Sequence, residues 1–225
     1  MPRDIDRAPR RRARRAIGAG LVLAVAACSD SAQITLPSGT VCVPYSFSPG
    51  TVTGQKGVPV GCAISQLSLP SWLSFSSPPP LVSGTPTGND YGNFLVSATG
   101  ICPGRVWGTN NWTITGLITI AAPAAPTAAP PLLINTASGP SVTSTVTGPA
   151  CATTYNVGTP TLTAGTNQPT LTPSGSVATT GGTFSETLSV INDLNGIGNF
   201  SVAIPPNGAT TSPVSGTIPF TIQFP

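Results

Sequence analysis

The stretch TIPFTIQF, residues 217–224, alternates apolar and polar side chains. Ile218, Phe220 and Ile222 recur at the two-residue spacing that turns one face of a β-strand toward a core and the other toward solvent. The segment 112–120 alternates in the same way. Elsewhere short apolar runs are broken by Gly, Pro, Asn and Ser, and none recurs at helical spacing over three turns. The sequence therefore predicts an all-β fold.

Two further strands are predicted at 183–191 and 199–205, joined by an Asn-Gly hairpin turn at 195–196. Pro219 lacks a backbone N–H, which predicts that the last strand, 214–224, lies at an edge of its sheet. The strand faces of this second half are rich in Thr, Ser and Gly, so its core is expected to be thinner than that of the first half.

The chain has 225 residues, no His, 26 Pro, 25 Gly and only 7% charged residues. Its length allows two small domains. Past residue 27 the only cations are Lys56 and Arg105, which leaves this part of the chain with a net charge of −2. It therefore lacks the basic surface that nucleic-acid binding requires. Without His, a serine nucleophile would depend on Lys56 as its base, so no enzymatic activity is expected.

The N-terminus has the features of an export signal. An Arg-rich opening runs into an apolar segment, residues 16–27, that is too short to cross a bilayer as a permanent helix. Its last residues and the next, Val-Ala-Ala-Cys, resemble the lipobox of bacterial lipoproteins, whose cysteine becomes the lipidated first residue. The resemblance implies removal of residues 1–27, acylation of Cys28 with chains such as palmitate, and a tether over residues 28–33. The alternative is an ordinary signal peptide that ends near a cysteine.

Anchoring by several acyl chains is stable without a membrane-spanning helix. Ser29 after the lipidated cysteine favours the outer membrane, because an Asp at that place resembles an inner-membrane retention signal.

Four further cysteines are an even number in an exported chain, so disulfide bonds are expected. A zinc site is disfavoured because the chain has no C-x-x-C pair and no His. The disulfide candidates are Cys42, Cys62, Cys102 and Cys151.

The segment AAPAAPTAAPP, residues 121–131, separates the first three of these cysteines from the fourth. Its prolines oppose strand pairing and favour an extended, semi-rigid spacer. We therefore expect a first β-sandwich domain at 34–121, a linker at 122–131 and a second β-sandwich domain at 132–225.

Four motifs follow one another in the first domain: VPYSF at 43–47, LPSWLSF at 69–75, LVSGTPT at 81–87 and YGNFLVSA at 91–98. In this order and spacing they resemble the immunoglobulin-like repeat, also called dystroglycan-type cadherin-like, of bacterial surface proteins. The resemblance implies an immunoglobulin-like sandwich and a surface or adhesive context, with no catalytic site. The second domain resembles no family that we can name.

The family pattern also suggests roles for single residues. Pro70 starts a strand where its missing N–H costs nothing, and Gly84 permits a tight turn. In an immunoglobulin-like topology a bond between Cys62 and Cys102 is reasonable, which leaves Cys42 and Cys151 to join the two domains and fix their angle. Four cysteines allow three connectivities, so the pairing stays open at this point. The core of the first sandwich is expected to hold Trp72, Leu73 and Phe75.

Two tryptophans flank the loop GTNN, residues 108–111. In a hairpin Trp107 and Trp112 stand side by side, either as a cross-strand core pair or as a flat platform for a sugar ring. The core pair is favoured because Trp112 continues an apolar row that includes Ile114.

Calcium is considered because cadherin-like modules often bind it between domains. The candidates are Asp90 and Asp193, each the one acid of an Asn-rich cluster. A calcium site needs about six to eight oxygens, so turns are favoured at both places and no cofactor is expected. Glu186 shares strand parity with Phe184 and Leu188. We expect it at a solvent-exposed rim, because an unpaired buried carboxylate is costly.

These features predict a lipid-anchored protein of the bacterial cell envelope that acts as a non-catalytic adhesive or structural surface module. Its expected partners are the membrane, through the anchor, and a surface glycan or an envelope or host protein; nucleic acid is excluded. One alternative is a carbohydrate-binding module that uses Trp107 and Trp112. Another is a periplasm-facing scaffold that offers its edge strands to an envelope partner.

Overall fold

The computed structural model describes residues 30–48, 63–76, 81–101, 111–129, 132–135, 137–166, 169–191, 194–209 and 211–224. Every regular element in these ranges is a β-strand, which confirms the all-β prediction. Across the described residues no helix has the length and apolar character needed to cross a membrane.

The strands of the N-terminal half form two sheets. One has the order β1-β8-β7-β4, with β2 also paired to β8, and the other has the order β3-β6-β5. The bounds are β1 (Asp30–Thr35), β2 (Gly39–Thr40), β3 (Tyr45–Phe47), β4 (Ala63–Ser68), β5 (Leu73–Ser76), β6 (Leu81–Gly84), β7 (Gly92–Ile101) and β8 (Asn111–Ala121).

The strands of the C-terminal half form two more sheets. One has the order β10-β18-β17-β12-β15, with β13 also paired to β17, and the other has the order β14-β16-β11-β9. The bounds are β9 (Thr127–Ala129), β10 (Leu132–Asn135), β11 (Ser141–Thr147), β12 (Thr154–Val157), β13 (Thr161–Gly165), β14 (Thr170–Thr172), β15 (Gly175–Ala178), β16 (Thr183–Ser189), β17 (Gly196–Ile204) and β18 (Val214–Gln223).

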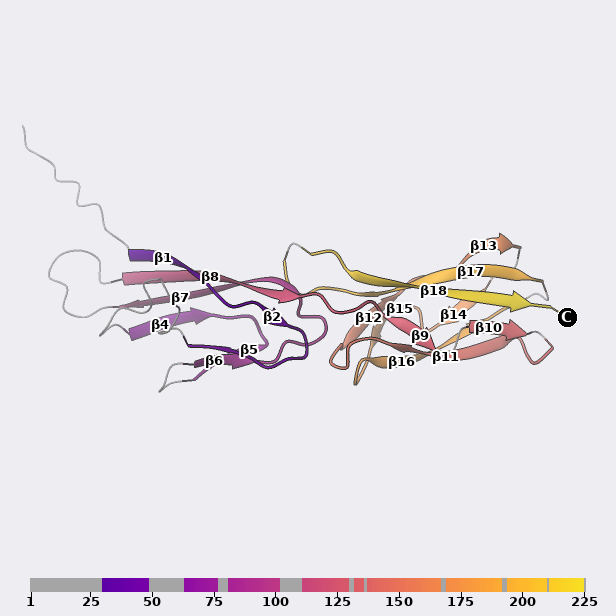
Figure 1. Ribbon diagram of the computed structural model, residues 1–225, viewed down its shortest axis with the longest axis horizontal. Coiled ribbons are helices and arrows are strands. Elements are labelled where there is room, and N and C mark those ends of the chain that lie inside the picture. Colours follow the sequence, from indigo (N-terminus) through magenta and orange to yellow (C-terminus); the bar gives the residue numbers. More distant parts are fainter. Residues whose placement is uncertain are drawn as a thin grey trace, which may run out of the picture.

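The two halves are sandwiches placed end to end, which gives the molecule an elongated shape (Figure 1). In each, an early strand pairs in parallel with the last long strand, β1 with β8 and β10 with β18. Within the described residues the only β-bridge between the halves is an isolated one from Asn93 to Ala209. The buried apolar side chains of the two halves nevertheless form one connected cluster.

The alternating segments behave as predicted in β8 and β18. Trp112, Ile114, Ile118 and Ile120 are buried along β8, and Ile218, Phe220 and Ile222 along β18. In the family motif, Leu73 donates its N–H to the Pro70 carbonyl over 3.0 Å, so a turn leads into β5. Trp72 packs edge-on against Tyr45 and Phe94, with ring centroids 5.8 and 5.7 Å apart.

Gly84 has a different role from the one its motif suggested. It is the last residue of β6 and pairs with both Tyr45 and Leu73. A Cβ at this position would lie 1.9 Å from the carbonyl oxygen of Trp72, so only glycine lets the two backbones approach this closely. The glycine is required for close packing of β5 on β6 rather than for a turn.

Two predictions about the last strands are wrong. The strand β18 is not an edge strand, because β10 pairs with it from Phe220 to Gln223, and this pairing begins one residue after Pro219. The Asn-Gly sequence at 195–196 does not close a hairpin, because β16 and β17 belong to different sheets and the connection crosses between them.

Two predictions about the start of each half also need correction. Residues 127–129, expected in the unpaired spacer, form β9 and pair with β11, because this short run is free of proline. The predicted tether at 28–33 is shortened, because β1 begins at Asp30. The core of the second sandwich is also not thinner than that of the first, since most of the largest fully buried apolar side chains lie in it, among them Tyr155, Phe200 and Phe220.

Candidate functional site

The joint between the two sandwiches is held by a disulfide bond from Cys42 to Cys151, with 5.6 Å between the Cα atoms and a sequence separation of 109. This is the interdomain pairing suggested above, and it is confirmed. Cys42 has a φ of 63°, and its N–H donates to the Pro86 carbonyl over 2.8 Å. Cys62 and Cys102 lie outside the described residues.

Asn89 is the centre of the polar contacts across this joint. Its amide nitrogen donates to the carbonyl oxygens of Thr154 and Pro205, over 2.9 and 3.1 Å. Its amide oxygen accepts from the backbone N–H groups of Thr153 and Thr154, over 2.9 and 3.2 Å. All of these partners belong to the C-terminal half, so a side chain from the first sandwich is fully used by the second.

Asp90, one of the two calcium candidates, is 5% exposed and uses both carboxylate oxygens within the protein. One oxygen accepts from the backbone N–H and the hydroxyl of Thr87, over 2.9 and 2.8 Å. The other accepts from the side-chain amide of Asn207 over 2.8 Å. The residue therefore forms a turn and a second interdomain contact.

Asp193, the other calcium candidate, lies outside the described residues. Over the part of the chain that the structure describes, no group of three or more His, Cys, Asp and Glu side chains could hold a metal ion.

The side chain of Tyr91, from the first half, reaches into the second half. Its buried hydroxyl donates to the carbonyl of Ile204 and accepts from the N–H of Val214, the latter over 2.9 Å. Burial raises the pKa of this phenol, partly offset by the hydrogen bond from Val214, so the hydroxyl stays protonated. Nothing in the sequence pattern had singled out Tyr91 or Asn207 as contact residues, because their partners are more than a hundred residues away.

Backbone groups complete the joint. The N–H of Gly88 donates to the Cys151 carbonyl over 3.0 Å, and the N–H of Asn207 donates to the Asn89 carbonyl over 2.7 Å. A Cβ at Gly88 would lie 2.7 Å from the Cα of Ala152, so glycine is needed for this close approach. A covalent bond, the buried Asn89 amide and backbone hydrogen bonds together oppose rotation of one sandwich against the other.

The tryptophan pair does not form an exposed platform within the described residues. Trp112 is 2% exposed on the inner face of β8, and Trp107 lies outside the described residues. An indole buried to this extent offers no face to a sugar.

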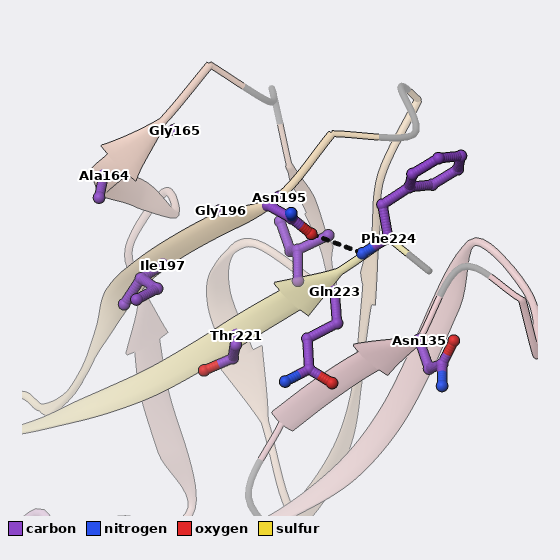
Figure 2. A pocket seen from close by; sticks show the side chains of 10 residues that line it. Asn135, Ala164, Gly165, Asn195, Gly196, Ile197, Thr221, Gln223 and Phe224 are labelled. Carbon is purple, nitrogen blue, oxygen red and sulfur yellow. Dashed lines mark hydrogen bonds between the residues drawn. The ribbon is translucent and has the colours of Figure 1, made fainter.

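An open depression of about 750 Å³ lies at the distal tip, the end of the second sandwich that is farthest from the first (Figures 1 and 2). Ile197 and Phe224 are exposed there, at 54% and 47%. Figure 2 shows Asn195 holding the end of the last strand, since its amide oxygen accepts from the N–H of Phe224 over 2.6 Å. The polar side chains of the depression are all uncharged among the described residues: Asn135, Asn195, Thr221 and Gln223.

Glu186 is placed differently from its prediction. It is 0% exposed and pairs with Ser144 across β11 and β16, so it does not lie at a solvent-exposed rim. The inward-facing row begins earlier than expected, because Phe184 packs against the core and Leu188 is fully buried. Regular alternation along β16 then carries Glu186 inside.

Comparison with known proteins gives distant likenesses only. No family model and no curated protein matches the chain. The D00-D0 domain of intimin is 14% identical with a TM-score of 0.28, over 81% of this chain and 94% of that one. Domains 1–6 of the surface layer protein SbsC are 14% identical with a TM-score of 0.33, over 77% of this chain and 21% of that one.

A SusE-like surface-located polysaccharide-binding protein from Bacteroides thetaiotaomicron is 13% identical with a TM-score of 0.26, over 86% of this chain and 33% of that one. At these values the likenesses carry no argument about what the protein does.

Proposed function

We propose that the protein is a lipid-anchored, non-catalytic surface module of a bacterial envelope, built as a stiff two-domain rod that serves adhesion or envelope structure. The interdomain joint carries this proposal. A flexible tandem needs neither a buried side-chain amide nor a covalent bond between its domains, and domains in one chain move relative to one another unless their interface is extensive. Asn89, Asp90, Tyr91 and the Cys42–Cys151 bond instead hold one fixed arrangement.

The position of the anchor supports the same proposal. Only Ser29 separates the proposed lipidated Cys28 from Asp30, the first residue of β1. The strand β1 begins at the end of the rod opposite the distal tip (Figure 1). Acylation of Cys28 would therefore seat the first sandwich directly on the membrane and hold the tip at the full length of the rod away from it.

Protease treatment of intact cells tests the surface assignment. The proposal expects an outside-only protease to remove both sandwiches while an acylated Cys28 peptide stays in the membrane fraction, as followed by mass spectrometry. The variant Cys28→Ser should move the protein to the soluble fraction. A chain that survives until the outer membrane is opened contradicts surface exposure and favours the periplasm-facing scaffold.

The distal depression favours carbohydrate binding as a second candidate function, at a different place from the tryptophans. Side-chain amides and a hydroxyl beside exposed Phe224 and Ile197 suit a neutral, hydroxyl-rich ligand, since sugars offer both hydrogen-bonding groups and apolar ring faces. Screening of the full chain on a panel of neutral glycans tests it.

Binding should be lost in Phe224→Ala combined with Gln223→Ala and kept in Leu117→Ala. The control removes an apolar side chain that is 50% exposed on the first sandwich. Equal loss in both variants, or no binding by the parent chain, refutes the site.

A further inference from the structure

Glu186 is the one polar side chain of the inward-facing row that Phe184, Leu188 and Val190 continue on and after β16. The register of β11 on β16 places Val142 opposite Leu188, Ser144 opposite Glu186 and Val146 opposite Phe184. Glu186 is fully buried, and neither of its carboxyl oxygens has a hydrogen-bond partner among the described residues. An ionised carboxylate in this setting has lost its water and gained no donor in return.

Residues 106–225, which include the whole second sandwich, supply no counter-ion for this carboxylate. Arg105 is the last cationic side chain of the chain, so residues 106–225 contain neither Lys, Arg nor His. A buried carboxylate is normally paired or hydrogen-bonded, and otherwise it becomes neutral by taking up a proton. Within the second sandwich, the Glu186 carboxylate can therefore become neutral only by taking up a proton.

No other titratable group on the neighbouring strands changes this conclusion. The strand β16 packs against β11 and β14 in its own sheet and against β10 across the sandwich, and none of these three strands carries an ionisable side chain in the described structure. Tyr155 of β12 contacts Phe184 of β16, with ring centroids 5.3 Å apart, and its hydroxyl donates to the Gly182 carbonyl over 2.7 Å. Burial raises the pKa of Tyr155, so it remains neutral when Glu186 titrates.

We propose that the second sandwich is an acid-strengthened module, which folds with the Glu186 carboxyl group in its neutral form and weakens as the medium becomes neutral and then alkaline. Burial raises the pKa of Glu186 from 4.5 to about 7. Because the folded-state value lies above the unfolded one, the folded state binds more protons between these values. The stabilisation is complete below about pH 4.5 and is lost as pH rises through about 7. The folding equilibrium constant should fall about 300-fold in total between pH values well below 4.5 and pH values well above 7.

A carboxyl titration tests the proposal directly, because Glu186 is the only Glu in the entire sequence. Selective ¹³C labelling of glutamate in the full mature chain gives a single carboxyl resonance that needs no assignment. The proposal expects a midpoint near pH 7 in the folded protein. A midpoint near 4.5 would overturn it, whatever the stability of any variant.

Stability profiles provide the second measurement. The melting temperature of the second sandwich should fall by roughly 10–20 °C between pH 4.5 and pH 8. Hydrogen exchange measured over a range of temperatures in peptides from residues 132–223 follows this sandwich separately from the first. Glu186→Gln should remove this fall. Asp193→Asn, which removes the other carboxylate of residues 106–225, is the matched control and should keep it. A parent profile that is flat, or a fall that persists in Glu186→Gln, contradicts the proposal. If Glu186→Gln does not fold, the carboxyl titration of the parent chain decides alone.

Discussion

The joint and the interior of the second sandwich each contain one buried carboxyl group, and the two groups have different surroundings. Asp90 in the joint is 5% exposed and accepts three hydrogen bonds, whereas Glu186 in the sandwich is 0% exposed and accepts none from the described residues. The backbone around Asp90 is a turn, which leaves N–H groups for a side chain to use. The backbone around Glu186 is a strand whose N–H groups are committed to the ladders of β11 and β14. Burial of a carboxyl group therefore destabilises the protein less in the joint than between the sheets.

Removal of the disulfide should have the largest effect on this comparison, because it asks whether the polar network holds the joint without a covalent bond. Cys42→Ser combined with Cys151→Ser opens a loop of 109 residues. We expect the free energy of unfolding to fall by about 4–5 kcal/mol, measured by denaturant titration. Small-angle scattering at low denaturant should still give an elongated particle. Unchanged stability would mean that the joint is fixed by hydrogen bonds alone.

Asn89→Asp should have the next largest effect. The substitution keeps the shape and the acceptor but replaces two donated hydrogen bonds with a carboxylate facing the Thr154 and Pro205 carbonyls. A loss of about 2–4 kcal/mol is expected by thermal or chemical unfolding at pH 7. Asn135→Asp is the control, since the Asn135 amide oxygen accepts from the Ala137 N–H and an acid can do the same. Similar losses in both variants would show that any added charge destabilises the protein.

Replacing each carboxyl group by an uncharged side chain should lower the free energy of unfolding at Asp90 and raise it at Glu186. Asp90→Asn exchanges one acceptor oxygen for an amide group and should cost about 1–2 kcal/mol at pH 7. Glu186→Met fills the same space without a polar group and should add about 1–3 kcal/mol at pH 8, with a smaller gain at pH 4.5 where the parent carboxyl is neutral. Denaturant unfolding at both pH values measures the pair. A loss of stability in Glu186→Met at pH 8 would place a hidden partner at this carboxyl.

The smallest difference in stability is expected between variants of two buried tyrosines. Tyr91→Phe removes a hydroxyl that makes two hydrogen bonds in the joint, and Tyr155→Phe removes one that donates only to Gly182. We expect losses of about 1–2 kcal/mol and about 1 kcal/mol, respectively. Calorimetry of the two variants side by side measures the difference. The reverse order would indicate that joint contacts reorganise to satisfy the freed groups.

Alternation along single strands was sufficient to predict the β-fold and the buried rows of β8 and β18. For Glu186 the alternation pattern correctly pointed inward, and the energetic objection to burying it was the misleading consideration. The Asn-Gly turn at 195–196 was recognised from local chemistry, but local chemistry does not say whether the next strand returns to the same sheet or crosses to the other.

The joint was predictable only in its covalent part. Cysteines can be counted, and an odd number before the linker requires one bond across it. Asn89 and Asn207 each read as loop residues, and their contribution depends on segments more than a hundred positions apart that a short sequence window cannot relate. Asp90 was considered for calcium on its residue type, whereas the structure shows its oxygens already occupied.

The disulfide also determines how the molecule bears mechanical tension. Under a pull between the base at β1 and the distal tip, the force passes from Cys42 directly to Cys151, and the 109-residue span between them is bypassed. At about 3.3–3.6 Å per residue, roughly 360–390 Å of chain is withheld from extension while the bond is intact. The first sandwich beyond β2, the proline-rich connection and the strands β9, β10 and β11 of the second sandwich lie inside that closed loop. They remain unstretched even when the part of the second sandwich that follows Cys151 has been pulled open.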